Sequence, residues 1–257
     1  MTDLIRSAVR RGVATITPDS PANRNALSSA LIEQLLAALA AAEADNAVRV
    51  IVISHTGPVF CSGADLKETA EAAATGKVPV SRLGAVLQAI WESAKPVVAR
   101  VAGPARAGGL GLVAASDIAV CSRSATFAFS EVRLGVIPAV ISATVLPRLN
   151  PRAAADLYLT GEAFDGARAE KIGLVTASVS EGLLEAAVDA YTSALVRGAP
   201  GALAGAKALL RRRQLATFGD EVAALTDLSV EFFGSAEGRE GVAAFREKRD
   251  PSWLPPA

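Results

Sequence analysis

Short runs of apolar, β-branched residues alternate with longer segments of helical period along the first part of this chain. The runs lie at 12–18, 48–54, 96–103, 117–122 and 173–180, are rich in Val and Ile, and end at Gly, Pro or Ser, as strands do. Because most of their residues are apolar, we expect both faces of these strands to be buried. The pattern predicts an α/β fold on a largely parallel sheet.

Helical segments fill the intervals between these strands. Residues 28–45 carry leucines at helical spacing behind a plausible N-cap at Ser28, and residues 80–94 repeat the pattern. Beyond residue 180 all segments have helical period and the β-branched runs disappear. The sequence therefore predicts a core over 1–180 and a helical C-terminal region over 181–257.

Composition argues against several classes of partner. The 257 residues are 51% hydrophobic, and 26 Lys and Arg balance 26 Asp and Glu. This balance favours neither nucleic acid nor an anionic membrane. No apolar run approaches the roughly 20 residues that span a bilayer, and no signal-peptide core is recognisable. We expect a soluble, cytoplasmic protein, with the basic cluster Arg211, Arg212 and Arg213 on a solvated helix face.

The cysteines and the single histidine give no metal pattern. Cys61 and Cys121 lie far apart, so they are expected to be small buried residues of a protein in a reducing compartment. His55 has no Cys or His neighbour and follows an apolar strand, which argues against a zinc site or a histidine-based triad. We expect no metal.

Two glycine turns each follow a strand and lead into a helix. The first is FCSGADLKE at 60–68, and the second is GPARAGGLGLVAASDI at 103–118, with Gly108 and Gly109 before the helix. Free N–H groups at a helix start can hold an anion, and glycine lets a ligand approach closely. Two such turns facing each other would form an oxyanion hole. Two ordinary strand-to-helix connections are the alternative.

Glu131 interrupts the apolar stretch FAFSEVRLGVIPAVIS at 127–142. A carboxylate flanked by Phe129 and Leu134 would be partly desolvated, which raises its pKa toward neutrality and suits a general acid or base. The alternative is a surface carboxylate paired with Arg133.

Six ordered motifs together resemble the crotonase superfamily, the enoyl-CoA hydratase/isomerase family, over nearly the whole chain. They are NRNALSSALIEQL, FCSGADLKE, GPARAGGLGLVAASDIAV, ATFAFSEVRLGVIPAV, LTGEAFDGARAEKIGLV and EGREGVAAFREKRDPSW. The resemblance implies a ββα spiral core with a C-terminal helical region that builds a homotrimer, often paired into a homohexamer. It also implies an acyl-CoA thioester substrate, with coenzyme A as part of the substrate and no further cofactor.

The resemblance assigns roles to residues at the predicted turns. The two N–H groups that hold the thioester oxygen fall on Ala64 and Gly108. The segment Ala64, Asp65 and Leu66 falls where main-chain groups meet the CoA adenine.

The C-terminal motif and the two expected carboxylates are assigned in the same way. Phe245 and Lys248 match a motif whose lysine can reach a CoA phosphate, the alternative for Lys248 being a solvated helix end. Glu131 takes the place of the glutamate that exchanges a proton at the α carbon. Gly111, also counted with the substrate-binding residues, stands where the water-activating glutamate is expected.

Three activities remain open at this point. The chain resembles a hydratase working with Glu131 alone, nearest in motif to the methylglutaconyl-CoA hydratase-like branch. An isomerase with one base and a non-catalytic acyl-CoA-binding protein are the alternatives. A dehalogenase branch also carries glycine at this position, but it needs a histidine base, and His55 lies outside the motifs. Arg106 or Arg133 could pair with a distal substrate carboxylate. The alternative is that both point outward or pair with an acidic neighbour.

Overall fold

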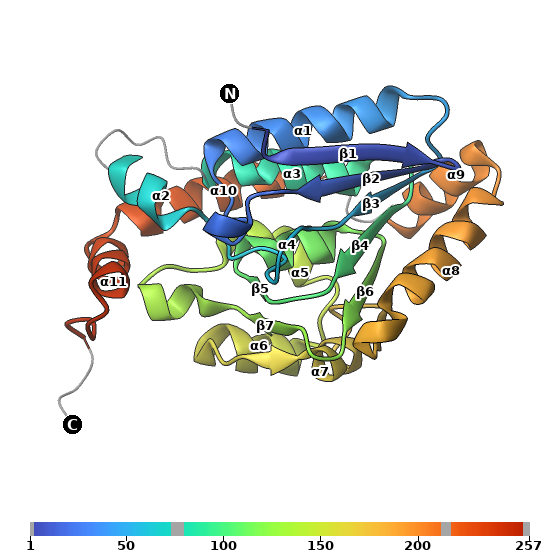
Figure 1. The fold of residues 1–257 in the computed structure, drawn as a ribbon. Coiled ribbons are helices and arrows are strands. Elements are labelled where there is room, and N and C mark those ends of the chain that lie inside the picture. The colour runs from blue at the N-terminus through green and yellow to red at the C-terminus, as the bar shows by residue number, and fades with distance from the viewer. Residues whose placement is uncertain (1–2, 73–79, 212–216, 254–257) are drawn as a thin grey trace.

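A six-stranded sheet of order β1-β2-β3-β4-β6-β9 runs through the centre of the computed structural model, which describes residues 3–72, 80–211 and 217–253 (Figure 1). The β1–β2 pair is antiparallel, and the other neighbouring pairs are parallel, which confirms the prediction of a largely parallel sheet. The strands are β1 (Ile5–Arg10), β2 (Val13–Pro18), β3 (Val50–Ile53), β4 (Val97–Val101), β6 (Ile118–Ser122) and β9 (Ala177–Val179). The edge strand β1 was not predicted because its side chains are mostly exposed and lack an apolar run.

Alternate residues of the central strands face two separate apolar clusters. In β3, Ile51 and Ile53 pack with the helices of one layer, whereas Val50 and Val52 pack with α8 on the opposite face. The helices of the first layer are α1 (Ser29–Ala44), α3 (Val80–Glu92) and α4 (Gly108–Ala115), and α8 spans Leu184–Val196. Burial on both faces explains why these strands read as continuous apolar runs.

The predicted helices over 28–45 and 80–94 are confirmed within a few residues. The Ser28 side chain accepts a hydrogen bond from the N–H of Leu31, which satisfies one of the free donors at the start of α1.

A second, three-stranded sheet of order β5-β7-β8 lies beside the core. Its strands are β5 (Ala105–Arg106), β7 (Thr126–Ala128) and β8 (Phe164–Asp165). These strands are too short to be recognised from the sequence. The connecting elements are η1 (Pro21–Asn23), α2 (Leu66–Ala72), η2 (Ser130–Leu134), α5 (Ala139–Val145), α6 (Pro151–Thr160), α7 (Gly166–Lys171) and η3 (Glu181–Leu183). This small sheet positions the two turns that form the candidate site.

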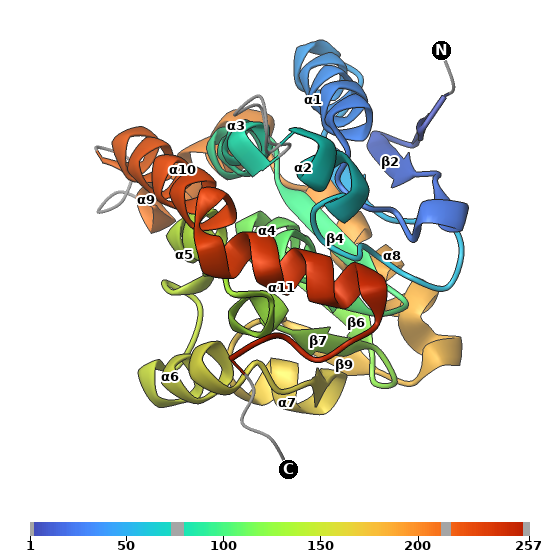
Figure 2. The same ribbon diagram turned by 90° about the vertical axis from the view of Figure 1, so that its left-hand side faces the viewer.

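The C-terminal part of the chain is helical, as predicted. After α8 come α9 (Pro200–Leu210), α10 (Phe218–Gly234) and α11 (Ala236–Glu247). Helix α10 packs on α3 and α5, and α11 packs on η2 and α2. Figure 2 shows α11 lying across this side of the molecule. Among the described helices, none has the length and apolarity that a membrane span requires.

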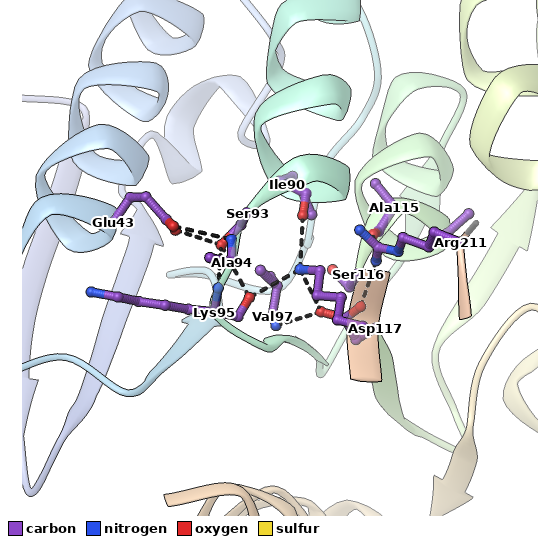
Figure 3. A network of polar contacts seen from close by, with 12 residues as sticks. Glu43, Ile90, Ser93, Ala94, Lys95, Val97, Ala115, Ser116, Asp117 and Arg211 are labelled. Carbon is purple, nitrogen blue, oxygen red and sulfur yellow. Dashed lines mark hydrogen bonds and ion pairs between the residues drawn. The ribbon is translucent and has the colours of Figure 1, made fainter. Parts of the chain in front are cut away.

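A buried charge cluster joins α9 to the carboxyl end of α4 (Figure 3). Asp117 forms ion pairs with Lys207 at 2.8 Å and with Arg211 at 2.5 Å, and both cations are buried. Arg211 also donates to the carbonyl of Ala115 and lies over the ring of Trp91.

The prediction of a solvated face for Arg211 is therefore wrong, since this side chain is 5% exposed. Carbonyls at the end of α4 lack helical partners, and together with Asp117 they hold the guanidinium inside. The predictions for Arg212 and Arg213 lie outside the described residues.

Candidate active site

The two predicted glycine turns lie against each other. The N–H of Arg106 donates to the carbonyl of Cys61 at 2.9 Å. A Cβ at Gly63 would lie 2.9 Å from that of Ala107, and one at Gly109 would lie 2.9 Å from that of Cys61. Gly63 also has φ +92°, which disfavours a side chain. Glycine is thus required at both turns for this close approach.

Each turn leaves at least one backbone N–H without a protein acceptor in the described part of the chain. On the first turn, Leu27 N–H donates to Gly63 and Asp65 N–H donates to Leu27, which leaves the N–H of Ala64 between them unpaired. On the second, Gly108 is the first residue of α4, where the helix offers no acceptor. All residues of α4 are buried, so solvent screens the partial positive charge at its start only weakly.

Ala107 holds the second turn in a strained conformation. Its backbone has φ 46° and ψ −117°, a region that residues with a Cβ rarely occupy and that costs on the order of 1–3 kcal/mol. Two hydrogen bonds hold Ala107 in this conformation. Its N–H donates to the carbonyl of Ala128, and its carbonyl accepts from the N–H of Leu110. This backbone conformation of Ala107 sets the direction in which the N–H of the next residue, Gly108, points.

Strand pairing brings Glu131 to the same edge as Gly108. Strands β5 and β7 are parallel, with Arg106 opposite Ala128, so both strands end at one edge of the small sheet. Gly108 follows β5 by two residues and Glu131 follows β7 by three. The sequence motifs on these two segments are thus neighbours in space.

Glu131 is a buried carboxyl without a protein partner on one oxygen. Glu131 is 7% exposed to solvent, and its Oε2 atom has no hydrogen-bond partner among the described residues. Burial raises the pKa of Glu131 to about 7, against the opposing effect of its own backbone N–H. Arg133 instead pairs with Glu162 at 2.5 Å, so the alternative of a surface Glu131–Arg133 pair is not found. A pKa near neutrality suits a group that both accepts and donates a proton.

Gly111 lies in an apolar environment. A Cβ at this position would lie 2.6 Å from Cγ2 of Ile141 and 3.2 Å from Cδ2 of Leu87. The side chain of Ile141 therefore fills the space that a larger residue at position 111 would need.

A cleft of about 580 Å³ extends from the first turn to α11. Ala64, Asp65, Leu66 and Phe245 line it, and so does Ser130, which precedes Glu131. The cleft is rich in cations that the sequence did not single out, because they come from distant segments: Arg24, Lys67 and Arg249, beside Arg106 and Arg133.

Lys248 is placed differently from Phe245. It is exposed, ends α11 with φ 55°, and does not belong to the described lining of the cleft. The next residue, Arg249, lines the cleft and forms ion pairs with Glu240 and Glu247.

Arg106 and Arg133 both have protein partners. Arg106 donates to the carbonyl and hydroxyl oxygens of Thr126 at 2.6 and 2.9 Å, and burial lowers its pKa. Arg133 donates to Thr160 and Glu162 and is half exposed. For Arg133, pairing with an acidic neighbour is the alternative that the contacts favour.

The cysteines and His55 have structural environments. Cys61 and Cys121 are free and buried, and burial raises the pKa of each thiol to about 12. His55 accepts a hydrogen bond from Ala102 N–H at 3.1 Å and packs edge-on against Phe60, and burial lowers its pKa. Across the described residues, no three metal-ligating side chains are grouped as a candidate metal site.

Comparison with known proteins gives the family. The sequence model described as Enoyl-CoA hydratase/isomerase matches residues 8–255. A crystal structure of an enoyl-CoA hydratase from Mycobacterium avium is 45% identical, with a TM-score of 0.88 over 99% of this chain and 100% of that one. The chain belongs to the enoyl-CoA hydratase/isomerase family and has its crotonase fold.

Two curated relatives are named for particular substrates. The 2,3-dehydroadipyl-CoA hydratase of Escherichia coli is 35% identical over 98% of this chain and 99% of its own length. The human mitochondrial methylglutaconyl-CoA hydratase is 32% identical over 95% of this chain and 74% of its own length. The protein is accordingly an enzyme of the hydratase/isomerase family, and an acyl-CoA substrate fits it.

Proposed function

We propose that this protein is a hydro-lyase that adds water reversibly to a 2-enoyl-CoA thioester, with Glu131 as its proton-transfer group. One observation carries the proposal: a buried carboxyl with a pKa near 7 lies at the sheet edge that also presents two unpaired N–H donors. Acyl chemistry at a thioester needs this combination of a proton carrier and an oxyanion hole.

In the proposed reaction, the N–H groups of Ala64 and Gly108 donate to the thioester oxygen. They stabilise the enolate that forms when water adds at the β carbon, and the start of α4 adds its partial positive charge. Glu131 delivers its proton to the α carbon and, as the carboxylate, takes a proton from the added water, so that the carboxyl ends the reaction in its starting state. The cleft beside Ala64 would take the coenzyme A part, where Arg24, Lys67 and Arg249 supply positive charge for its phosphates.

Two relatives support a dicarboxylic acyl group as the substrate class, since both names describe acyl chains with a second carboxyl group. Fatty-acid or branched-chain acyl-CoA metabolism would use such a reaction. We propose no cofactor beyond the coenzyme A of the substrate.

Replacing Glu131 by Gln should abolish hydration while leaving acyl-CoA binding within a few-fold of wild type. The amide keeps the shape of the side chain but cannot carry the proton. Turnover is measured with crotonyl-CoA and 3-methylglutaconyl-CoA, and binding by calorimetry. Glu162→Gln is the matched control, because Glu162 is exposed and pairs only at the surface. Unchanged turnover in the Glu131 variant would contradict the proposal.

A one-base isomerase or a non-catalytic acyl-CoA-binding protein is the second candidate. The packing of Ile141 over Gly111 favours these two functions over hydration, because it leaves no room for a second carboxylate at position 111. Measurable binding of both thioesters without hydration or double-bond migration would support the binding protein, whereas migration alone would support the isomerase.

A further inference from the structure

The C-terminal motif contains a glycine and a tryptophan to which the proposed reaction gives no role. Gly241 lies on α11, and Trp253 lies beyond the end of that helix. Helix α11 packs on η2, the short helix that carries Glu131. The C-terminal motif therefore contacts the segment that carries the proposed proton-transfer group.

Helix α11 and the end of η2 meet backbone against backbone. A Cβ on Gly241 would lie 2.2 Å from the carbonyl oxygen of Leu134, the last residue of η2. A Cβ on Gly135 would lie 2.4 Å from the carbonyl oxygen of Glu237 on α11. Both values are shorter than the distances that real Cβ atoms keep from backbone atoms, and Gly135 also has φ +67°. Glycine at both positions is what allows the two backbones to approach this closely.

The Trp253 ring covers the junction of α11 and η2. Its Cη2 atom would lie 3.1 Å from a Cβ on Gly135 and 2.9 Å from a Cβ on Gly241. One edge of the ring thus contacts a glycine of each element and closes the junction between them. Trp253 is 40% exposed and belongs to none of the described apolar clusters, so it contributes little to the core.

Glu240 holds the chain beyond α11 in place. Lys248 ends the helix with φ 55°, and the chain then turns back along it (Figure 2). The Glu240 carboxylate accepts hydrogen bonds from both Nη atoms of Arg249, at 2.7 and 2.9 Å, and from the N–H of Ser252 at 2.8 Å. Ser252 directly precedes Trp253, so these contacts determine where the Trp253 ring lies.

Gly135 connects this junction to the backbone of Glu131. It ends η2, and its N–H donates to the carbonyls of Glu131 and Val132. The next N–H, that of Val136, donates to the Glu131 carbonyl at 3.1 Å. Because Oε2 of Glu131 has no hydrogen-bond partner among the described residues, the direction of the carboxyl depends on how this backbone is held.

We propose that Trp253 is a positioning residue for Glu131: together with the backbone of α11, its ring clamps the end of η2 and thereby fixes the direction of the Glu131 carboxyl. The catalytic meaning of this inference rests on the proposed function. Misplacing a reacting group by about 1 Å can cost about a hundredfold in rate, so a clamp of this kind matters for turnover.

Amide hydrogen exchange in the full-length protein tests the clamp without any turnover. In Trp253→Ala the N–H of Val136 should exchange about tenfold faster, because the turn that it closes on the Glu131 carbonyl opens more often. The N–H of Ile51, which donates to Pro96 in the central sheet, reports general unfolding and should change less.

A second variant disturbs the same junction from α11. Gly241→Ala places a methyl group against the Leu134 carbonyl and should also speed exchange at Val136 more than at Ile51. Gly234→Ala is the matched control, because a Cβ at this last residue of α10 meets nothing within 4 Å and should leave both exchange rates unchanged.

Hydration of crotonyl-CoA tests the consequence for catalysis. Trp253 is not among the described residues that line the cleft. Trp253→Ala should therefore lower kcat by about tenfold or more and leave KM within about twofold of wild type. Trp253→Phe retains a ring and should give an intermediate kcat. A structural role alone would lower the unfolding temperature without changing the kcat of the folded enzyme.

Equal acceleration of exchange at Val136 and Ile51 in both junction variants would show general destabilisation and overturn the inference. An unchanged kcat in folded Trp253→Ala enzyme would overturn it as well. Thermal unfolding of each variant checks that it is folded. The exchange result does not depend on turnover, so an active Glu131→Gln enzyme would refute the proposed function and leave the evidence for the clamp intact.

Discussion

Gly111 carries no side chain because Ile141 occupies the space beside it. The two residues are thirty positions apart, and the β-branched side chain of Ile141 has little rotamer freedom in its helix. The position is thus part of the apolar packing between α4 and α5.

Gly111→Ala should lower the free energy of unfolding by about 1–3 kcal/mol, because a methyl group there overlaps Ile141. Gly111→Glu should be less stable still and gain no hydration activity, since a carboxylate would be buried against apolar atoms. Urea unfolding measures both. Gly205→Ala is the control, because a Cβ there meets nothing within 4 Å and should be neutral or slightly stabilising. A Gly111→Glu protein as stable as wild type would contradict this account of the packing.

Helix α4 is held at both ends. Its first residue, Gly108, lies on the candidate oxyanion turn, and its last carbonyls accept hydrogen bonds from two arginines of other elements. Arg148 donates to Ala114 and Arg211 to Ala115. Cations at this end also interact favourably with the helix dipole.

Lys207 makes the stability of this element depend on pH. Burial lowers its pKa to about 8, more than Asp117 raises it, from 10.5 for the free side chain. Between pH 8 and 10.5 the unfolded chain retains a proton that the folded chain has lost, so this group makes the protein more stable as pH rises. The gain is on the order of 3 kcal/mol at most.

The contribution of Lys207 is the difference between the unfolding free energies of wild type and Lys207→Met, measured from pH 7.5 to 10.5. Lys207→Met should lose that part of the pH dependence, whereas Lys171→Met, at an exposed site, should keep it. Identical pH curves for wild type and Lys207→Met would show that the Asp117 pair keeps Lys207 charged.

On the scale of the whole molecule, the cleft joins segments from all parts of the chain. Arg24, Ala64, Arg106, Ser130 and Phe245 line it together. A ligand bound there would therefore link the N-terminal part, the small sheet and α11, and should stabilise the protein by mass action.

The helical C-terminal region leaves apolar side chains in solvent. Leu209 and Leu210 on α9 are 68% and 87% exposed in the single chain, although the same helix turns Lys207 inward. We expect these leucines to be covered in the proposed homotrimer or homohexamer. Light scattering should give a trimeric or hexameric mass that falls in Leu210→Asp; a monomeric wild type would contradict the expectation.

The sequence by itself determined the features that depend on local pattern. Continuous apolar runs predicted buried parallel strands, Ser28 marked a helix start, and the apolar stretch around Glu131 predicted its burial. Motif order along the chain indicated the family before any contact was known. The pairing of Ala64 with Gly108 in one oxyanion hole stays a prediction, supported by the meeting of their turns.

Only the tertiary structure decided the features that join distant residues. It turned Arg211 inward onto Asp117, placed Ile141 over Gly111, and paired Arg133 with Glu162. Each depends on which segments pack together and on which acceptors they leave free. Side-chain direction and hydrogen-bond polarity follow from that packing, and local periodicity contains no information about either.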